Sequence, residues 1–155
     1  MHLRVVAVGT RQPAWIQAGT VDYLRRLPKE WKAELVEVPA AARGAHADVP
    51  RCRAAEAERI LRAARGARLI ALDEHGAEHT SAQWAAELRG WLRDGRDVAM
   101  AIGGPDGHGP ELLETAEERW SLSRLTLPHG LARVLLLEQL YRAWSITANR
   151  PYHRA

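Results

Sequence analysis

The sequence predicts an α/β fold in which a mainly parallel sheet is sandwiched by helices. Short apolar runs recur along the chain, and longer stretches rich in helix-forming residues separate them. Glycine and proline mark most of the boundaries between the two kinds of segment. The length of 155 residues suits one compact domain, so we expect residues 1–155 to form a single domain.

In the first half of the chain, strands and helices alternate. Leu3–Gly9 predicts a buried strand, because the run is apolar, β-branched and closed by glycine. A helix is expected over 13–28, bounded by a proline at each end. Alternation over Ala33–Val38 predicts a second strand. The polar stretch Pro39–Pro50 predicts a loop, and the Ala-, Glu- and Arg-rich run Arg51–Arg65 predicts a helix.

The second half continues the pattern. Ala67–Leu72 predicts a third strand, and the next helix can be capped at Thr80-Ser81 and end at Gly95. The expected elements that follow are a fourth strand over Asp97–Ile102, a short helix over Pro110–Glu118, a short fifth strand over Trp120–Leu122, and a long helix over Leu131–Ala148 that Asn149-Arg150-Pro151 ends.

Ligands of such sheets bind beyond the carboxyl ends of strands, so the loops after Leu72, Ile102 and Leu122 are the candidate site. The loop after Ile102 favours a nucleoside-like small molecule, although a merely tight turn is the alternative. It lacks the Lys-Ser/Thr of a phosphate-binding loop and the spacing of a dinucleotide fingerprint. Its glycines are Gly103, Gly104, Gly107 and Gly109.

The loop after Leu72 contains acids and histidines, which raises the question of a metal. Gly76 interrupts any helix that would bring His75 and His79 to one face, and no further ligand cluster follows. We therefore predict no metal site here. The stretch from Asp73 to Gly76 is interpreted instead as a solvated turn or the edge of a ligand loop.

The charge of the chain is uneven. Residues 119–155 carry six arginines and one acid, a net charge of +5, whereas the whole chain carries +3, so residues 1–118 carry −2. A basic C-terminal quarter indicates an anionic partner there, unless the arginines only decorate a helix. We expect a cytoplasmic protein without a membrane span, because no apolar run suits an export signal or a bilayer and Cys52 has no disulfide partner.

The C-terminal helix has a wide apolar surface that needs a partner, either the sheet or a second subunit. Packing explains Arg133 and Arg142 less well than it explains the apolar residues around them. The tail over Arg150–Arg154 combines aromatic, histidine and arginine side chains, which suits stacking on an unpaired RNA base and contact with phosphate. A frayed terminus is the alternative interpretation.

The run from Ser121 to Arg154, SLSRLTLPHGLARVLLLEQLYRAWSITANRPYHR, closely resembles the family of large-subunit ribosomal RNA pseudouridine N3-methyltransferases known as RlmH. The resemblance extends over essentially the whole chain. Gly130 stands where many members of that family have proline, a change that removes no functional group. The shorter matching segments are Val6–Thr10, Tyr23–Arg26, Leu72-Asp73, Gly95–Asp97 and Ile102–Pro105.

This resemblance implies a SPOUT-class fold with a C-terminal trefoil knot and a homodimer in which the partner subunit borders each cofactor site. It implies S-adenosylmethionine as methyl donor. It also implies a pseudouridine of a large-subunit (23S) rRNA stem-loop as substrate, methylated on the assembled ribosome. The cofactor positions that it implies are Leu72, Gly103, Leu122, Ser123, Arg124, Leu125, Thr126 and Leu127.

Methylating N3 of pseudouridine requires a proton to leave, which a base or a stabilising cation assists. His129 is the candidate base and Arg142 a second candidate catalytic residue, although packing of the turn explains His129 about as well. We expect Arg142 and Arg154 to contact RNA phosphate or orient a base, Tyr152 to stack on a base, and His153 to contribute to the same surface.

Three other functions remain open from the sequence. The chain could be a non-catalytic RNA-binding module or ribosome assembly factor, which would need no cofactor. It could be another nucleotide-dependent enzyme such as an oxidoreductase, although the missing fingerprint argues against this. It could also be a SPOUT methyltransferase with another target base or a tRNA substrate.

Overall fold

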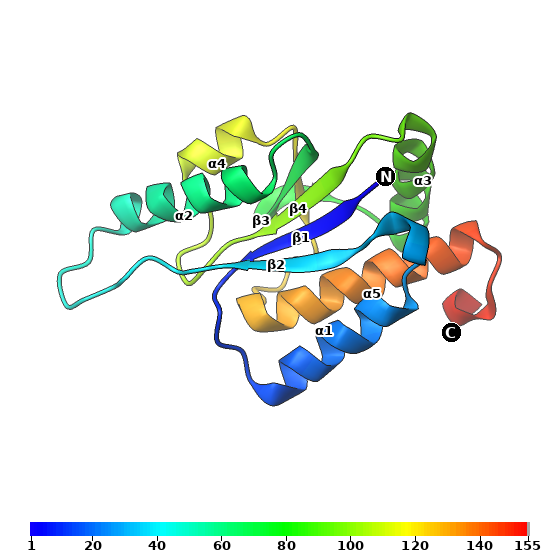
Figure 1. The fold of residues 1–155 in the computed structure, drawn as a ribbon, viewed down its shortest axis with the longest axis horizontal. Coiled ribbons are helices and arrows are strands. Elements are labelled where there is room, and N and C mark those ends of the chain that lie inside the picture. The colour runs from blue at the N-terminus through cyan, green and yellow to red at the C-terminus, as the bar shows by residue number, and fades with distance from the viewer. Residues whose placement is uncertain (155) are drawn as a thin grey trace.

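The computed structural model describes residues 1–154 and consists of a five-stranded parallel sheet between two layers of helices (Figure 1). Ala155, the last residue of the predicted domain, lies outside the described residues. The sheet has the order β2-β1-β4-β3-β5, and every neighbouring pair is parallel. The strands are β1 (Leu3–Val8), β2 (Glu34–Val38), β3 (Arg68–Glu78), β4 (Val98–Ile102) and β5 (Glu118–Ser121).

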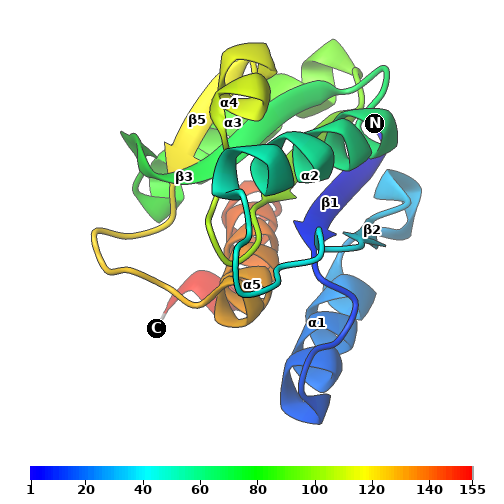
Figure 2. The ribbon, with the colours of Figure 1, turned by 90° about the vertical axis from the view of Figure 1, so that its left-hand side faces the viewer.

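Helices cover both faces of the sheet, which explains why the central strand is apolar throughout and why all five of its residues are buried. One face packs against α1 (Ala14–Arg26), α3 (Ser81–Asp94) and α5 (His129–Thr147). The other face packs against α2 (Val49–Ala63) and α4 (Pro110–Thr115), as Figure 2 shows end-on. Two short 3-10 helices, η1 (Lys29–Trp31) and η2 (Pro151–Arg154), complete the described elements. The predicted fold class is confirmed.

The predicted ends of α3 are confirmed in detail. The Thr80 hydroxyl accepts a hydrogen bond from the backbone N–H of Gln83 at 3.2 Å, and the Gln83 side chain accepts one from the backbone N–H of Thr80 at 2.7 Å. This reciprocal pair is a capping box. Gly95 ends the helix at a positive φ of 74°, which glycine adopts without steric cost.

The third strand differs most from its prediction. We expected it to end at Leu72 and Asp73–Gly76 to form a turn, but β3 continues to Glu78 alongside β5, with an irregularity between Leu72 and Ala77. The interpretation as a solvated turn is therefore wrong. Gly76 lies against the edge of β5, where an added Cβ would be 2.7 Å from the backbone of Trp120. The glycine that suggested a turn instead permits a close approach of two strands.

Other boundaries differ by a few residues. The fifth strand begins at Glu118 and ends at Ser121, and α4 ends at Thr115 rather than Glu118. α2 begins earlier than expected because Asp48 caps it, its carboxylate accepting from the backbone N–H of Arg51 at 3.2 Å. The last helix begins two residues early, at His129, directly after Pro128. This last shift makes His129 a helical residue.

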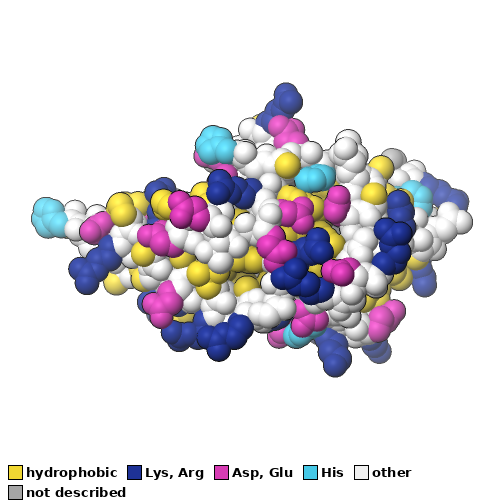
Figure 3. Space-filling model, turned by 90° about the horizontal axis from the view of Figure 1, so that it is seen from above, with side chains coloured by type: hydrophobic (Ala, Val, Ile, Leu, Met, Phe, Trp, Pro, Cys, Tyr) yellow, Lys and Arg dark blue, Asp and Glu magenta, His cyan; other side chains and the backbone are white. Residues whose placement is uncertain are grey.

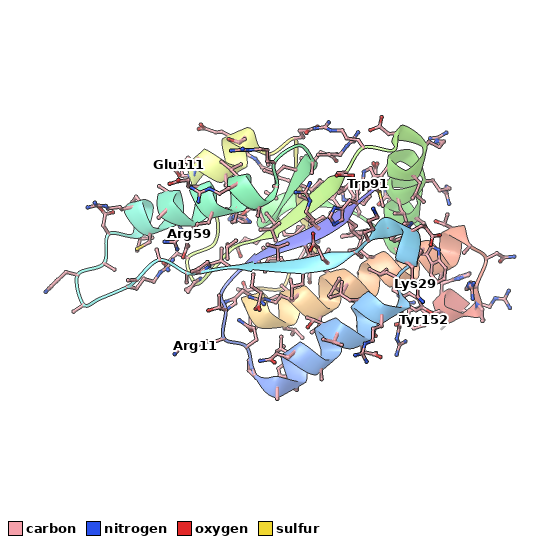
Figure 4. All side chains as sticks on the ribbon, in the orientation of Figure 1. Arg11, Lys29, Arg59, Trp91, Glu111 and Tyr152 are labelled. Carbon is pink, nitrogen blue, oxygen red and sulfur yellow. The ribbon has the colours of Figure 1, made fainter. Side chains whose placement is uncertain are left out.

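A cluster of tryptophans fixes β5 against α3. The ring of Trp120 stacks on that of Trp91, with 5.5 Å between centroids, and meets the edge of Trp84 at 4.8 Å. All three are almost fully buried, and Figure 4 labels Trp91 between α3 and the sheet. The loop that follows β5 therefore begins at a rigid point.

No helix within residues 1–154 is long and apolar enough to span a bilayer. The passage of the C-terminal chain through a trefoil knot stays a prediction.

Candidate functional site

The carboxyl ends of β3, β4 and β5 open onto a cavity of about 650 Å³. Each of the three segments predicted from the strand ends contributes to its wall, and the volume is in the range of small-molecule sites. Of the predicted cofactor positions, the wall includes Leu72, Gly103, Leu122, Ser123, Leu125, Thr126 and Leu127. Their assignment to cofactor binding stays a prediction, but they do converge on one cavity.

Arg124 is the predicted cofactor position that does not line the cavity. Its side chain is 88% exposed, and its Nε donates to the carboxylate of Glu78 at 3.0 Å. Arg124 therefore contacts the outer end of β3 on the solvent side, where such an exposed pair contributes little to stability.

The glycines after β4 form a tight turn that brings backbone to the cavity. Gly104 and Gly107 are bridged, with the N–H of Gly107 donating to the carbonyl of Gly104 at 3.0 Å. Gly107 has a φ of 67°, which favours glycine. A Cβ added to Gly103 would lie 2.8 Å from the carbonyl carbon of Gly107. The backbones of Gly103 and Gly107 therefore pack too closely to admit an alanine at position 103.

Several residues line the cavity that the sequence did not single out for it. His108 borders it and lies mostly buried, with Nε2 at 3.1 Å from the carbonyl of Ala101. Burial lowers the pKa of His108, so its imidazole is neutral at physiological pH. Arg53 reaches the cavity from α2, and its Nε donates to the carbonyl of Asp106 at 2.8 Å. In the sequence, only the position of His108 among the glycines indicated that it could line the site. No sequence pattern indicated this for Arg53.

Asp73, Glu74 and His75 lie on the irregular part of β3 and border the same cavity. Their interpretation as the edge of a ligand site agrees with this position, although they belong to a strand. Within residues 1–154, no group of three or more His, Cys, Asp or Glu side chains is arranged to hold a metal ion.

His129 lies where the cavity meets the start of α5, and it is half-buried. Burial lowers the pKa of His129, and the nearby cation of Arg133 lowers it further. A neutral imidazole is therefore the main form at physiological pH. Such a group can accept a proton from a molecule bound in the cavity.

Arg133 has a structural role, and the inference that packing explains it poorly is wrong. Its side chain is 1% exposed and pairs with the carboxylate of Glu37 on β2. It also donates to the carbonyls of Gly9 at 2.8 Å and Val8 at 3.2 Å. The arginine thus ties α5 to the ends of β1 and β2.

Arg142 and the C-terminal tail lie outside this cavity. Arg142 pairs with Glu138 at 2.8 Å, and its guanidinium is 5.1 Å from the ring centroid of Tyr152. The Tyr152 hydroxyl is 3.1 Å from that of Tyr23 and donates to Glu138 at 3.2 Å. Burial and these partners raise the pKa of Tyr152. The tail forms η2 against α5, so the interpretation as a frayed terminus is wrong.

The two candidate catalytic residues are far apart in one chain. His129 and Arg142 belong to the same helix, and a rise of about 1.5 Å per residue separates them by roughly 20 Å along its axis. Tyr152 and the rest of η2 lie near the end of α5 that is opposite His129 (Figures 1 and 4). His153, 3.5 Å from Ser145, and the exposed Arg154 lie there as well.

Comparison with known proteins agrees with this architecture. A structure described as a probable methylase family protein from Haemophilus influenzae Rd KW20 superposes with a TM-score of 0.56 at 12% identity, covering 97% of this chain and 69% of that one. This similarity supports the fold. The family model described as "Predicted SPOUT methyltransferase" matches residues 1–153. The chain therefore belongs to the SPOUT methyltransferase family, whose members are enzymes that transfer a methyl group.

Proposed function

We propose that this protein uses S-adenosylmethionine to methylate N3 of a pseudouridine in a stem-loop of large-subunit (23S) rRNA, on the assembled ribosome in the cytoplasm. The observation that carries the proposal is the convergence of three strand-end segments on one cavity in a SPOUT methyltransferase. The resemblance of Ser121–Arg154 to the RlmH family supports the choice of target. A C-terminal trefoil knot, which the same resemblance implies, is also part of the proposal.

The cavity fits such a donor in size and chemistry. The backbone of Gly103 borders the cavity, and apolar walls at Leu72 and Leu127 suit an adenine ring. The carboxylates of Asp73 and Glu74 can accept hydrogen bonds from ribose hydroxyls and favour a cationic sulfonium. When bound, S-adenosylmethionine supplies an already activated methyl group. The protein then has mainly to orient the acceptor and remove its proton.

We assign proton removal to His129. Its imidazole borders the cavity, and both burial and Arg133 keep it neutral. The dipole of α5 acts in the same direction, because His129 lies at the positive end of that helix. A neutral imidazole near N3 can accept the imide proton as the methyl group is transferred.

Replacing His129 with glutamine should lower the single-turnover methylation rate by roughly 100-fold or more, the usual contribution of a general base. The rate of the unchanged protein should fall as pH drops through the pKa of His129, below about 6.5, because protonation removes the base. The variant should lose this acidic limb. Rates measured from pH 5 to 8 with saturating donor test this. Equal rates and equal pH profiles would leave His129 with a packing role.

In a homodimer, the cavity of one protomer can meet the C-terminal tail of its partner, although cavity and tail are far apart within one chain. Within one chain, Arg142 lies roughly 20 Å along α5 from His129, too far to contact the same nucleotide. An antiparallel pairing would bring the tail of one protomer to the cavity of its partner. Trp15 and Val21 on α1 are 62% and 44% exposed, and burial against a second copy would remove this apolar surface from water.

The RNA contact is assigned to Arg142, Tyr152, His153 and Arg154, in the basic C-terminal quarter. The face shown in Figure 3 carries acidic and basic side chains interspersed, without a broad basic field. Weak general attraction to RNA follows from a net charge of only +3. Selectivity should therefore come from the shape of the ribosome around the target.

Two measurements test the proposal. Calorimetry should detect binding of S-adenosylmethionine to the purified protein; no binding would favour the assembly-factor alternative. Mass mapping of rRNA from cells lacking the gene should reveal loss of one methyl group at a pseudouridine. Loss of a methyl group from another base or from tRNA would retain the family but change the substrate.

A further inference from the structure

One arginine connects the segment before α2 to the glycine turn of the cavity. Arg43 lies in residues 39–48, between β2 and α2. Its Nε donates to Oδ2 of Asp106 at 2.7 Å, and its two terminal nitrogens donate to the two carboxylate oxygens of Glu56 at 2.8 and 3.0 Å. Three separate segments therefore meet at one guanidinium.

The buried carboxylate of Glu56 requires a cationic partner, which Arg43 supplies. The Glu56 side chain on α2 is 3% exposed, and a buried carboxylate is costly unless a cation pairs with it. Oε2 of Glu56 also accepts from the backbone N–H of Ala41 at 2.9 Å, so the carboxylate holds both the side chain and the backbone of the 39–48 segment. The planar fork of arginine suits this two-point contact.

The other end of the bridge lies in the wall of the cavity. Asp106 stands inside the turn that Gly104 and Gly107 close, and it borders the cavity, whereas Arg43 and Glu56 do not. A Cβ on Gly104 would come within 3.4 Å of Glu56 Oε1, so the carboxylate also lies directly behind the turn. The bridge thus supports the turn from the side opposite the ligand.

We propose that Arg43 is a positioning residue: acting through Asp106, it sets the shape of the glycine turn and couples donor binding to the 39–48 segment. The proposal rests on the proposed function only in naming S-adenosylmethionine as the donor. Coupling of this kind is reciprocal. If the segment stabilises the binding shape of the turn, bound donor must stabilise the segment, which projects beyond the body of the protein at the left of Figure 1.

Asp106→Asn tests the coupling with little risk to folding, because it keeps the side-chain size and leaves the Arg43–Glu56 pair intact. We expect roughly tenfold weaker binding of S-adenosylmethionine by calorimetry, the usual effect of weakening one hydrogen bond between charged groups. In the unchanged protein, donor should slow amide hydrogen exchange over residues 40–47. The variant should lose much of this protection.

Arg59→Ala is the matched control. Arg59 lies on α2 and donates to the carbonyl of Pro39 at 2.6 Å, so it tethers the same segment without reaching the glycine turn (Figure 4). Because the Arg43–Asp106 contact stays intact in this variant, we expect its donor affinity to fall much less than in Asp106→Asn and the donor-dependent protection to persist. Weaker donor binding in this variant, equal to that in Asp106→Asn, would overturn the specific role of the Arg43–Asp106 contact.

Arg43→Lys completes a double-mutant cycle, since lysine keeps the charge but not the fork. Binding by the double variant Arg43→Lys, Asp106→Asn should be no weaker than by Arg43→Lys alone; additive losses would contradict action through Asp106. If the unchanged protein binds no S-adenosylmethionine, the proposed function fails. Amide hydrogen exchange in donor-free protein then tests whether the Arg43–Asp106 contact shapes the turn. Asp106→Asn must speed exchange over residues 103–109, and an unchanged exchange rate would overturn the positioning role of Arg43.

Discussion

Replacing Gly103 with alanine is expected to weaken donor binding strongly. The added Cβ would lie 2.8 Å from the carbonyl carbon and 3.0 Å from the Cα of Gly107, and both are backbone atoms that cannot rotate away. The turn must therefore shift into or away from the cavity. Overpacking of this kind costs about 1–3 kcal/mol of folding stability. Because the displaced turn no longer matches the bound donor, we expect affinity for S-adenosylmethionine to fall as well, by roughly 10- to 100-fold in calorimetry.

Gly90→Ala provides the control for this substitution. Gly90 lies within α3, and a Cβ there would meet no atom within 4 Å. Alanine should raise the free energy of unfolding by about 0.5–1 kcal/mol, because glycine is unfavourable inside a helix. Donor affinity should stay unchanged. Normal donor binding by Gly103→Ala would show that the glycine turn does not shape the site.

Mixed dimers should recover activity that neither parent has. At a donor concentration well below the Kd of Gly103→Ala, we expect this variant to leave its cavity without donor and Arg142→Ala to lose the RNA contact. If the tail of one protomer serves the cavity of its partner, a dimer of the two variants has one intact site. Random pairing makes half of the dimers mixed, so activity should reach about a quarter of that of the unchanged protein. Coexpression with two purification tags and methylation of ribosomes measure this.

A pair of variants in the same cavity is the control for the mixing experiment. Dimers of Gly103→Ala with His129→Gln carry one defect in each cavity, so they should show no recovery. Absence of recovery in the Gly103→Ala and Arg142→Ala pair, with dimers demonstrated, would mean that each chain serves its own cavity. Recovery of activity in both pairs would mean that recovery does not report which tail serves which cavity.

The position of the cavity could be predicted because it depends on local patterns. Apolar runs ending at Leu72 and Ile102 indicated where strands finish, and parallel strands bring such ends to one edge of a sheet. Local chemistry also indicated the cap at Thr80 and the end of α3 at Gly95. The extension of β3 beyond Leu72 had no such pattern, because pairing with β5 stabilises a polar stretch that has little tendency to form a strand alone.

By itself, the sequence determined the α/β class, the order of its elements, and which strand ends open onto the cavity, since these follow from the spacing of apolar residues and turn formers. Only the tertiary structure decided the roles of its arginines. Arg133 meets Glu37 across 96 residues, and Arg43 meets Asp106 across 63. The sequence around an arginine does not indicate whether it is buried or exposed, because the carboxylates and carbonyls that contact it belong to distant segments.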